Sequence, residues 1–248
     1  MMTAAFNDAF SDYDIPAKYT VEYLTNLVKR RGYRPDLAVG EFDGDRLVGF
    51  VFNCLDADAA YNSGTGTAIS HRRQGIARRL MQRSIETLPA KRYILEVIES
   101  NERAAALYRE LGFVETRRFQ CWTFSGGQTI LSVRTGKIAC PPLDESWFDQ
   151  TPSWQNSLAS VRRASEPYAI LGDDCGFVVV FPSNGDVPLL AVRRDQRGKG
   201  IGRSLLTAAA QHAGKPLRIM NVEDRFEPFL ARIGAKKLVR QIEMIRSL

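Results

Sequence analysis

The chain has 248 residues, of which 44% are hydrophobic and 25% charged, and its formal net charge is +6 at pH 7. This composition is typical of a globular protein that buries a core, and it argues against a disordered chain. No apolar run approaches the roughly 20 residues that span a bilayer, and the first ten residues lack the basic start of a secretory signal. We therefore expect a cytoplasmic protein with no membrane partner, built as one large domain or two modest ones.

The few cysteines and histidines argue against a metal site. The two histidines, His71 and His212, offer little material for a metal centre or a Ser-His-Asp triad. The cysteines lack the short paired spacing of a zinc site and the density of a secreted disulfide scaffold. We expect reduced, mostly structural cysteines and no bound metal; the four are Cys54, Cys121, Cys140 and Cys175.

The first half of the chain predicts alternating helices and strands. Helical spacing of apolar residues predicts helices at 3–10 and 21–31. Apolar runs on both sides of Asp43-Gly44 predict a hairpin, because this dipeptide favours a two-residue turn. A polar stretch follows at 56–63. The further predicted elements are a strand at 65–69, a helix at 76–88, a strand at 93–98, a helix at 102–111 and a strand at 115–124.

The second half repeats this order. Glycine- and proline-rich segments bracket a poorly patterned region, so we predict domains at 1–127 and 151–248, with 128–150 as a linker or crossover strand. Because the first half lacks an opening strand, 129–135 is a candidate for a strand that crosses the junction. The predicted elements of the second half are a helix at 154–162, strands at 168–171, 177–181 and 187–192, a helix at 202–213, a strand at 217–222, a helix at 226–233 and a strand at 237–245.

One motif occurs twice at matching positions. RxxGxARxL at 72–80 corresponds to RxxGxGRxL at 197–205, and each half later reaches an apolar-Gly-x sequence, at 111–113 and 233–235. A matched motif in matched order predicts duplication of one structural unit.

Each copy of the motif predicts an anion-binding turn. A strand that ends in a basic turn and opens into a helix directs unpaired backbone N–H groups and the positive helix end at one spot. Gly75 and Gly200 let the backbone approach a ligand closely. The clustered charge suits a small phosphorylated ligand rather than a nucleic acid, which a longer basic stripe would bind. The alternative is a helix start with a solvated basic face, and two copies at one position of a repeat weigh against it.

At these residues the sequence resembles the GNAT superfamily of acyl-CoA-dependent N-acetyltransferases, whose signature is Arg/Gln-x-x-Gly-x-Gly/Ala after a strand. The first half adds the later motif NERAAALYRELGF at 101–113. Gly-x-Gly-x-x-Gly and Gly-Lys-Ser/Thr are absent, which argues against Rossmann and Walker sites. The resemblance implies an α/β (α+β mixed sheet) fold with two GNAT-like domains in tandem. Each would have a mostly antiparallel sheet with a splayed parallel pair, flanked by helices.

The resemblance also implies the cofactor, acetyl-CoA. Its pyrophosphate would be held by the turn amides, and its pantetheine would lie between the splayed strands near Thr67 and Val97. The residues predicted to bind it are Thr67, Arg72, Arg73, Gln74, Gly75, Ile76, Ala77, Arg78 and Asn101 in the first half, and Val192, Arg197, Gly198, Lys199, Gly200, Gly202 and Arg203 in the second.

Acetyl transfer to an amine needs a base, an oxyanion donor and an acid. An alkyl ammonium titrates near pH 10, so a base or water chain must take its proton. A backbone N–H near Thr67 is a candidate donor to the thioester oxygen. Tyr108 matches the family tyrosine near the thioester sulfur, which implies that it protonates the leaving thiolate. The alternative for Tyr108 is a helix residue that only packs.

The base is less defined by sequence. Glu96, in a predicted buried strand, is the first candidate for the base or for a water relay, although a carboxylate paired with an arginine is an alternative. Glu41 and Asp14 compete with it. Asn101 could cap the following helix, contact pantetheine, or do both.

The second half departs from the motif where the chemistry would occur. In register with Asn101 and Tyr108 it has Glu223 and Leu230, and a leucine cannot protonate a thiolate. We predict that the first half is catalytic and that the second binds cofactor weakly or shapes the acceptor cleft. Catalysis in the second half, with its cleaner Gly200-x-Gly202 turn, and a non-catalytic acyl-CoA sensor or interaction module are the alternatives.

The expected reaction is N-acetylation of a primary amine of a small molecule or peptide by direct attack in a ternary complex. The expected assembly is a monomer that is an internal pseudo-dimer, or a homodimer.

Overall fold

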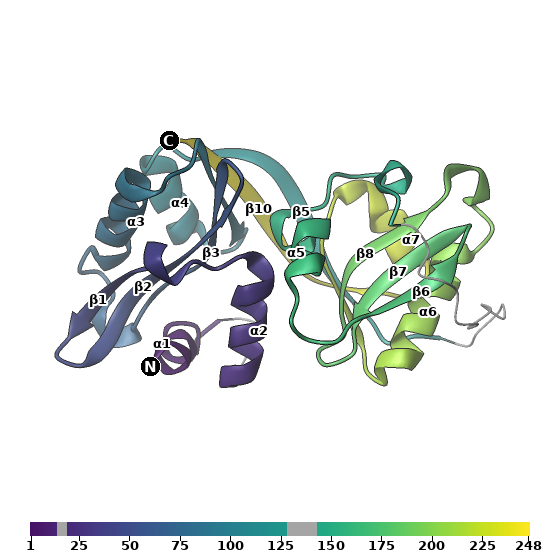
Figure 1. Ribbon diagram of the computed structural model, residues 1–248, viewed down its shortest axis with the longest axis horizontal. Coiled ribbons are helices and arrows are strands. Elements are labelled where there is room, and N and C mark those ends of the chain that lie inside the picture. Colours follow the sequence, from purple (N-terminus) through teal and green to yellow (C-terminus); the bar gives the residue numbers. More distant parts are fainter. Residues whose placement is uncertain (14–18, 128–142) are drawn as a thin grey trace. The chain divides into compact units, whose positions relative to one another are not determined.

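The computed structural model describes residues 1–13, 19–127 and 143–248 (Figure 1). Asp14, Cys140 and the candidate strand at 129–135 lie outside these ranges. The chain divides into two compact units. The first comprises Met1–Arg117, Arg162–Ser165 and Ile242–Leu248, and the second comprises Arg118–Val161 and Glu166–Gln241.

The first unit is a mixed sheet with helices on both faces. Its strand order is β1-β2-β3-β4-β10-β5, with the last residues of β10 and the first residues of β5 as its final two strands. The strands are β1 (Val39–Asp43), β2 (Arg46–Asp56), β3 (Ala59–Thr67), β4 (Arg92–Ile98), β5 (Val114–Phe124) and β10 (Lys236–Ser247). The helices are α1 (Met2–Ala9), α2 (Val21–Arg31), α3 (Ile76–Thr87) and α4 (Glu102–Glu110).

Two strands of this sheet part toward one end. β1, β2 and β3 are antiparallel neighbours, whereas β3 and β4 run parallel from Ala59↔Arg92 to Asn62↔Leu95. Their pairing ends there, although β3 continues to Thr67 and β4 to Ile98. The separated ends leave backbone groups facing a gap, which positions the site described below.

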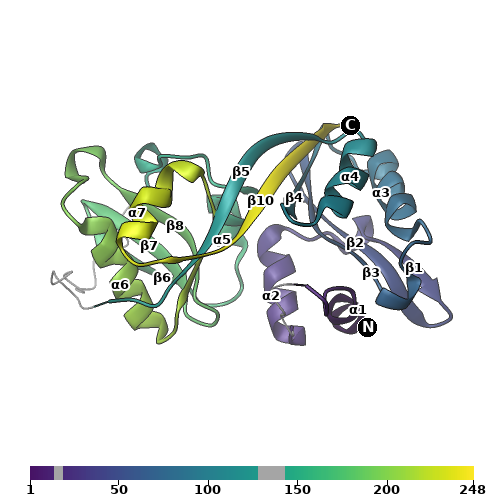
Figure 2. The ribbon, with the colours of Figure 1, turned by 180° about the vertical axis from the view of Figure 1, so that it is seen from behind.

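Apolar side chains on the two faces of the sheet hold different helix pairs. Leu80 and Tyr108, from α3 and α4, share one core with Val48, and Phe6 and Leu24, from α1 and α2, share another with the opposite face. This division follows from the alternation of side chains along a strand. Figures 1 and 2 show α3 and α4 side by side on one face and α1 and α2 on the other.

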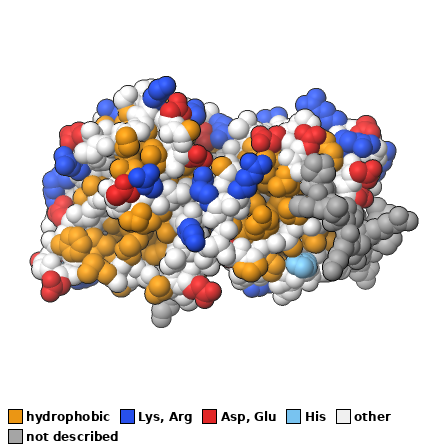
Figure 3. Space-filling view, viewed as in Figure 1, with side chains coloured by type: hydrophobic (Ala, Val, Ile, Leu, Met, Phe, Trp, Pro, Cys, Tyr) orange, Lys and Arg blue, Asp and Glu red, His pale blue; other side chains and the backbone are white. Residues whose placement is uncertain are grey.

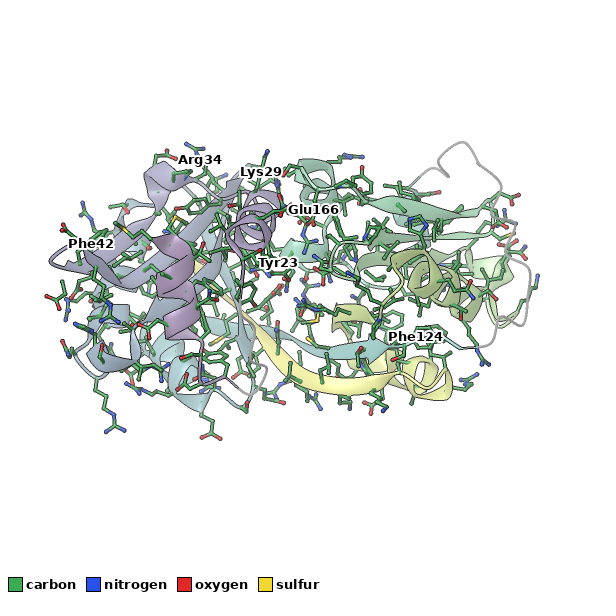
Figure 4. The ribbon with its side chains drawn as sticks, turned by 90° about the horizontal axis from the view of Figure 1, so that it is seen from below. Tyr23, Lys29, Arg34, Phe42, Phe124 and Glu166 are labelled. Carbon is green, nitrogen blue, oxygen red and sulfur yellow. The ribbon has the colours of Figure 1, made fainter. Side chains whose placement is uncertain are left out.

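Local signals in the sequence explain where the helices start and stop. Thr20 caps α2 by accepting a hydrogen bond from the Tyr23 N–H (3.1 Å), and Gly32 ends it in the left-handed region at φ 86°. Basic residues fill its last turn, where the helix dipole favours them. Tyr23 and Lys29 mark this helix in Figure 4.

The second unit repeats the arrangement. Its strand order is β5-β9-β8-β7-β6, and β5 contributes the residues that pair with β9, including Phe124 (Figure 4). β8 and β9 are parallel and share one registered pair, Asp186↔Arg218. The further elements are α5 (Leu158–Arg163), β6 (Ala169–Asp173), β7 (Gly176–Phe181), β8 (Asp186–Val192), α6 (Ile201–Ala213), β9 (Leu217–Val222) and α7 (Glu227–Arg232).

The predicted fold class is confirmed, with a mixed sheet, one parallel pair and flanking helices in each unit. Two predicted elements differ from the structure in their bounds. The strand predicted at 65–69 is longer and starts earlier, because β3 begins at Ala59 and pairs with β2 on one side and β4 on the other. The predicted helix at 154–162 is a 3₁₀ turn, Trp154–Asn156, followed by α5. Across the described ranges, no helix is both long and apolar enough to cross a membrane.

Candidate active site

A cavity of about 630 Å³ opens in the first unit where β3 and β4 part. Its walls come from the end of α1 and the residues after it, the end of β3, the basic turn with the start of α3, and the end of β4 with α4. Eight residues predicted from the sequence line it: Thr67, Arg72, Arg73, Gly75, Ala77, Arg78, Asn101 and Tyr108. Gln74, Ile76 and Glu96 are not among its lining residues, and Ile76 is buried beneath the turn.

The basic turn has the geometry of an anion-binding helix start. Gly75 is the N-cap of α3 at φ 76°, and Arg73 also lies in the left-handed region at φ 66°. No side-chain hydrogen bond caps this helix, so its first N–H groups face the cavity end without a side-chain acceptor. Such a helix start attracts anions through its N–H groups and its dipole.

Two guanidinium groups at the cavity edge are available to a ligand. Within the ranges that the structure describes, Arg73 and Arg103 make no ion pair, and both are exposed. Arg78, by contrast, pairs with Glu110. On one face of the molecule, Figure 3 shows Lys and Arg side chains next to Asp and Glu side chains. The two unpaired arginines therefore concentrate positive charge at the cavity mouth.

Arg72 stabilises the wall of the cavity. Its guanidinium donates to the Asp12 carboxylate (2.6 Å) and to the Ala9 carbonyl (2.9 Å). The hydrogen bond from Arg72 lowers the pKa of Asp12. The side chain that sequence reasoning assigned to the ligand thus holds the segment after α1 in place.

Tyr108 is a buried phenol on the cavity wall. Tyr108 is 8% exposed, and burial raises the pKa of its hydroxyl to about 12. A hydrogen bond with Thr65 lowers this pKa by a smaller amount. The hydroxyl therefore keeps its proton at neutral pH and can serve as a hydrogen-bond and proton donor to a group beside it.

Asn101 joins two walls of the cavity. Its Oδ1 accepts a hydrogen bond from the Ala104 N–H (3.1 Å), which caps α4. Its Nδ2 donates to the Tyr13 hydroxyl (2.9 Å). The predicted capping role is confirmed by this geometry, and the predicted contact with pantetheine stays a prediction.

The three carboxylates considered as bases differ in position. Glu96 lies on β4, two residues before the cavity-lining residue Ile98. Its carboxylate accepts a hydrogen bond from the Tyr61 hydroxyl (3.0 Å). Glu41 pairs with Arg79 (2.6 Å), which also donates to the Gln74 carbonyl and so supports the turn. Asp14 lies outside the described residues.

The second unit keeps the turn, and the described residues between its parted strands enclose a much smaller cavity. Gly200 caps α6 at φ 82°, but the cavity between β8 and β9 is only about 90 Å³. None of the seven residues predicted there, Val192, Arg197, Gly198, Lys199, Gly200, Gly202 and Arg203, is among its lining residues. Leu230 lies buried at the position that Tyr108 has in the first unit.

Sequence reasoning missed several residues of the cavity wall, among them the polar residues Asp12, Tyr13, Thr65 and Arg103. The first two follow α1 in a segment without periodicity, so no pattern placed them near the turn. Arg103 lies inside the recognised motif, two residues after the helix cap, and its position on the first turn of α4 was the available signal.

Two models of known families match the sequence. One, described as the acetyltransferase (GNAT) family, matches residues 2–113, and another, described as an acetyltransferase (GNAT) domain, matches residues 164–234. Together they cover most of both halves. No curated protein matches the sequence closely enough to count as a relative.

Solved structures share the fold over the whole chain. A GCN5-related N-acetyltransferase from Sphaerobacter thermophilus is 18% identical with a TM-score of 0.70, over 99% of this chain and 91% of that one. A tandem GNAT protein from the clavulanic acid biosynthesis pathway is 16% identical with a TM-score of 0.62, over 99% and 94%. A GCN5-related N-acetyltransferase from Kribbella flavida is 15% identical with a TM-score of 0.55, over 100% and 68%. At these identities the likeness concerns the fold alone.

Proposed function

This chain belongs to the GNAT acetyltransferases and carries two such domains in tandem, and from that premise we propose that its first unit transfers an acetyl group from acetyl-CoA to a primary amine. The acceptor is a small molecule or a peptide. One observation carries the proposal: a single cavity of about 630 Å³ joins an anion-binding helix start to a buried phenol that keeps its proton.

The first unit has the residue types that acetyl-CoA requires. The N–H groups at the start of α3, with Arg73 and Arg103, would hold phosphate groups. The unpaired ends of β3 and β4 would flank the pantetheine arm, whose amides can bond to free backbone groups. The arm would then bring the thioester between Thr67 and Tyr108.

The transfer step makes one bond and breaks one. The nitrogen of the neutral amine attacks the thioester carbonyl carbon, the new C–N bond forms, and the C–S bond breaks with its electron pair on sulfur. Tyr108 gives its proton to this thiolate, and the nitrogen loses a proton to a base. A backbone N–H at the end of β3 would stabilise the negative charge on the carbonyl oxygen.

Glu96 is the proposed base, acting through water. Two residues of strand span about 7 Å, so its carboxylate lies one strand repeat beyond the cavity wall at Ile98. At this separation the carboxylate would not contact an amine in the cavity directly. One water molecule between the carboxylate and the amine would carry the proton in general-base catalysis.

A thiol-release assay with acetyl-CoA and a panel of primary amines tests the proposal. Tyr108→Phe removes only the hydroxyl, so we expect kcat to fall about 10²- to 10⁴-fold while acetyl-CoA still binds. Tyr33→Phe is the matched control, because that hydroxyl contacts the Met2 sulfur (4.0 Å) and is not among the cavity-lining residues. Equal turnover in the Tyr108→Phe variant, or no amine acetylated by the wild type, would contradict the proposal.

Glu96→Gln tests the base in the same assay. Glutamine has nearly the same shape but cannot accept the proton, so we expect a lower rate at pH values where the amine is largely protonated. Wild-type rates throughout would remove Glu96 from the mechanism.

A further inference from the structure

The groove between β8 and β9 in the second unit contains a segment of the unit itself. The two strands share only the pair Asp186↔Arg218, although β8 runs on to Val192 and β9 to Val222. In the first unit the same parting of strands leaves about 630 Å³, whereas here about 90 Å³ remains. Phe148, Gln150 and Asn156 line the small space that is left.

The Gln150 side chain forms hydrogen bonds with backbone groups at the end of β9. Its Nε2 donates to the Asn221 carbonyl (3.1 Å), and its Oε1 accepts from the Glu223 N–H (2.8 Å). The Gln150 carboxamide thus satisfies the same backbone carbonyl and N–H group at the end of β9 to which an amide-containing ligand would otherwise bind. A ligand could bind there only by displacing Gln150 and matching both bonds.

Two further polar contacts hold the segment against β9. Asn156 donates to the Met220 carbonyl (2.7 Å), and Asn221 donates to the Ser153 hydroxyl (3.1 Å). Ser153 and Asn221 are both 0% exposed. Buried polar groups satisfied in this way are costly to separate, because each would lose its partner without gaining water.

The start of the segment is tied to the second basic turn. Arg197 forms an ion pair with Asp149 (2.7 Å) and donates to the Trp147 carbonyl (3.2 Å). The rings of Trp147 and Phe148 pack near the Phe177 ring, with centroids 6.0 and 6.1 Å away. Charge and apolar contact therefore fix the segment before it enters the groove.

We propose that residues 147–156 are a built-in occupant of the second groove, so that each chain binds one acetyl-CoA, in the first unit. The second unit is then a structural copy that has no acyl-transfer site. The proposal rests on the proposed function for the identity of the coenzyme, and its occupancy claim rests on the contacts of Gln150 and Asn156 with β9 and Glu223.

Calorimetric titration of the full chain with acetyl-CoA tests the stoichiometry. We expect one site per chain in the wild type and none in Gly75→Glu, where a carboxylate would stand at the start of α3. Gly44→Glu is the matched control, because Gly44 is also left-handed (φ 56°) and an added Cβ there meets nothing within 4 Å. Two sites in the wild type, or one site that persists in Gly75→Glu, would overturn the proposal.

Hydrogen exchange without coenzyme tests the occupancy independently. Gln150→Ala should speed exchange of the Glu223 amide about tenfold, because that N–H loses its acceptor. Gln211→Ala, at an exposed position of α6, should leave it unchanged. An unchanged Glu223 amide in Gln150→Ala would overturn the proposal. If the wild type bound no acetyl-CoA, the proposed function would fail, and this exchange rate would still decide whether the groove is filled.

Discussion

Tyr108 is the residue on which the proposed chemistry depends most. It lies on the cavity wall, and its surroundings favour the neutral phenol over the phenolate. Thr65 hydrogen-bonds to it, and Asn62 in turn donates to the Thr65 hydroxyl (2.7 Å), so the phenol is oriented from β3. An oriented acid that keeps its proton is suited to a leaving thiolate.

The raised pKa of Tyr108 predicts the shape of the pH profile. A phenol with its ordinary pKa near 10 would be half ionised at pH 10, whereas a pKa of about 12 leaves Tyr108 protonated there. The acid form is the active one, so raising the pKa extends activity to higher pH. We expect kcat/KM to rise from pH about 6 to about 10 as the amine loses its proton, with no falling limb. Circular dichroism at each pH controls for unfolding, and a fall in kcat/KM below pH 10 with the fold intact would contradict this assignment.

At the scale of elements, the position of α3 depends on close packing over β2. A Cβ on Gly49 would lie less than 3.0 Å from Cγ2 of Ile76, the first residue of α3. The helix start, and with it the anion-binding turn, is therefore held at a distance from the sheet that only glycine permits.

Gly49→Ala should weaken both stability and coenzyme binding. Overpacking of this kind costs about 1–3 kcal/mol, and relief by movement of α3 would shift the turn at Gly75. Urea unfolding should show the lost stability, and KM for acetyl-CoA should rise. The control is Gly127→Ala, where the nearest described atom to an added Cβ is Nη2 of Arg203, 3.8 Å away. Wild-type stability and KM in Gly49→Ala would show that α3 does not rest on this contact.

α4 offers a test that separates its cap from its link to Tyr13. Asn101→Ala removes the acceptor for the Ala104 N–H and should lower the free energy of unfolding by about 1 kcal/mol. Asn101→Asp keeps an acceptor at the cap and loses only the donor to the Tyr13 hydroxyl, so it should keep most of that stability. Urea midpoints for the two variants measure the difference, and equal losses would contradict the capping role.

Periodicity and turn signals predicted most elements to within a few residues, and they failed where distant contacts decide. The residues at 59–63 read Ala-Ala-Tyr-Asn-Ser, which lacks the alternation typical of a strand, yet pairing on both sides makes them part of β3. The recurring motif predicted the turn, and the motif at 101–113 predicted Asn101 and Tyr108 at the cavity. It could not place Asp12 and Tyr13, because their positions depend on hydrogen bonds to Arg72 and Asn101 from far along the chain.

At the scale of the whole molecule, the units do not follow the order of the sequence. The first unit includes Ile242–Leu248, and there Glu243 is buried and accepts hydrogen bonds from Thr116 and Arg117. The repeated motif predicted two copies of one fold. It carried no information on which sheet the last strand joins, since the partners lie more than a hundred residues apart and β pairing depends on packing rather than on local pattern.

The two copies also differ in a way that the repeat concealed. Both have a glycine at the helix start, but the first has an open cavity and a phenol, while the second has a filled groove and a leucine. Leu230 was readable from the sequence, whereas the filling by residues 147–156 required their side-chain contacts.

A hydrogen-exchange footprint of acetyl-CoA on the full chain shows which basic turn holds the coenzyme. We expect saturating coenzyme to slow exchange of the amides at 73–78 and to leave those at 198–203 unchanged. An absence of protection at 73–78, or protection confined to 198–203, would contradict the assignment of the coenzyme to the first unit.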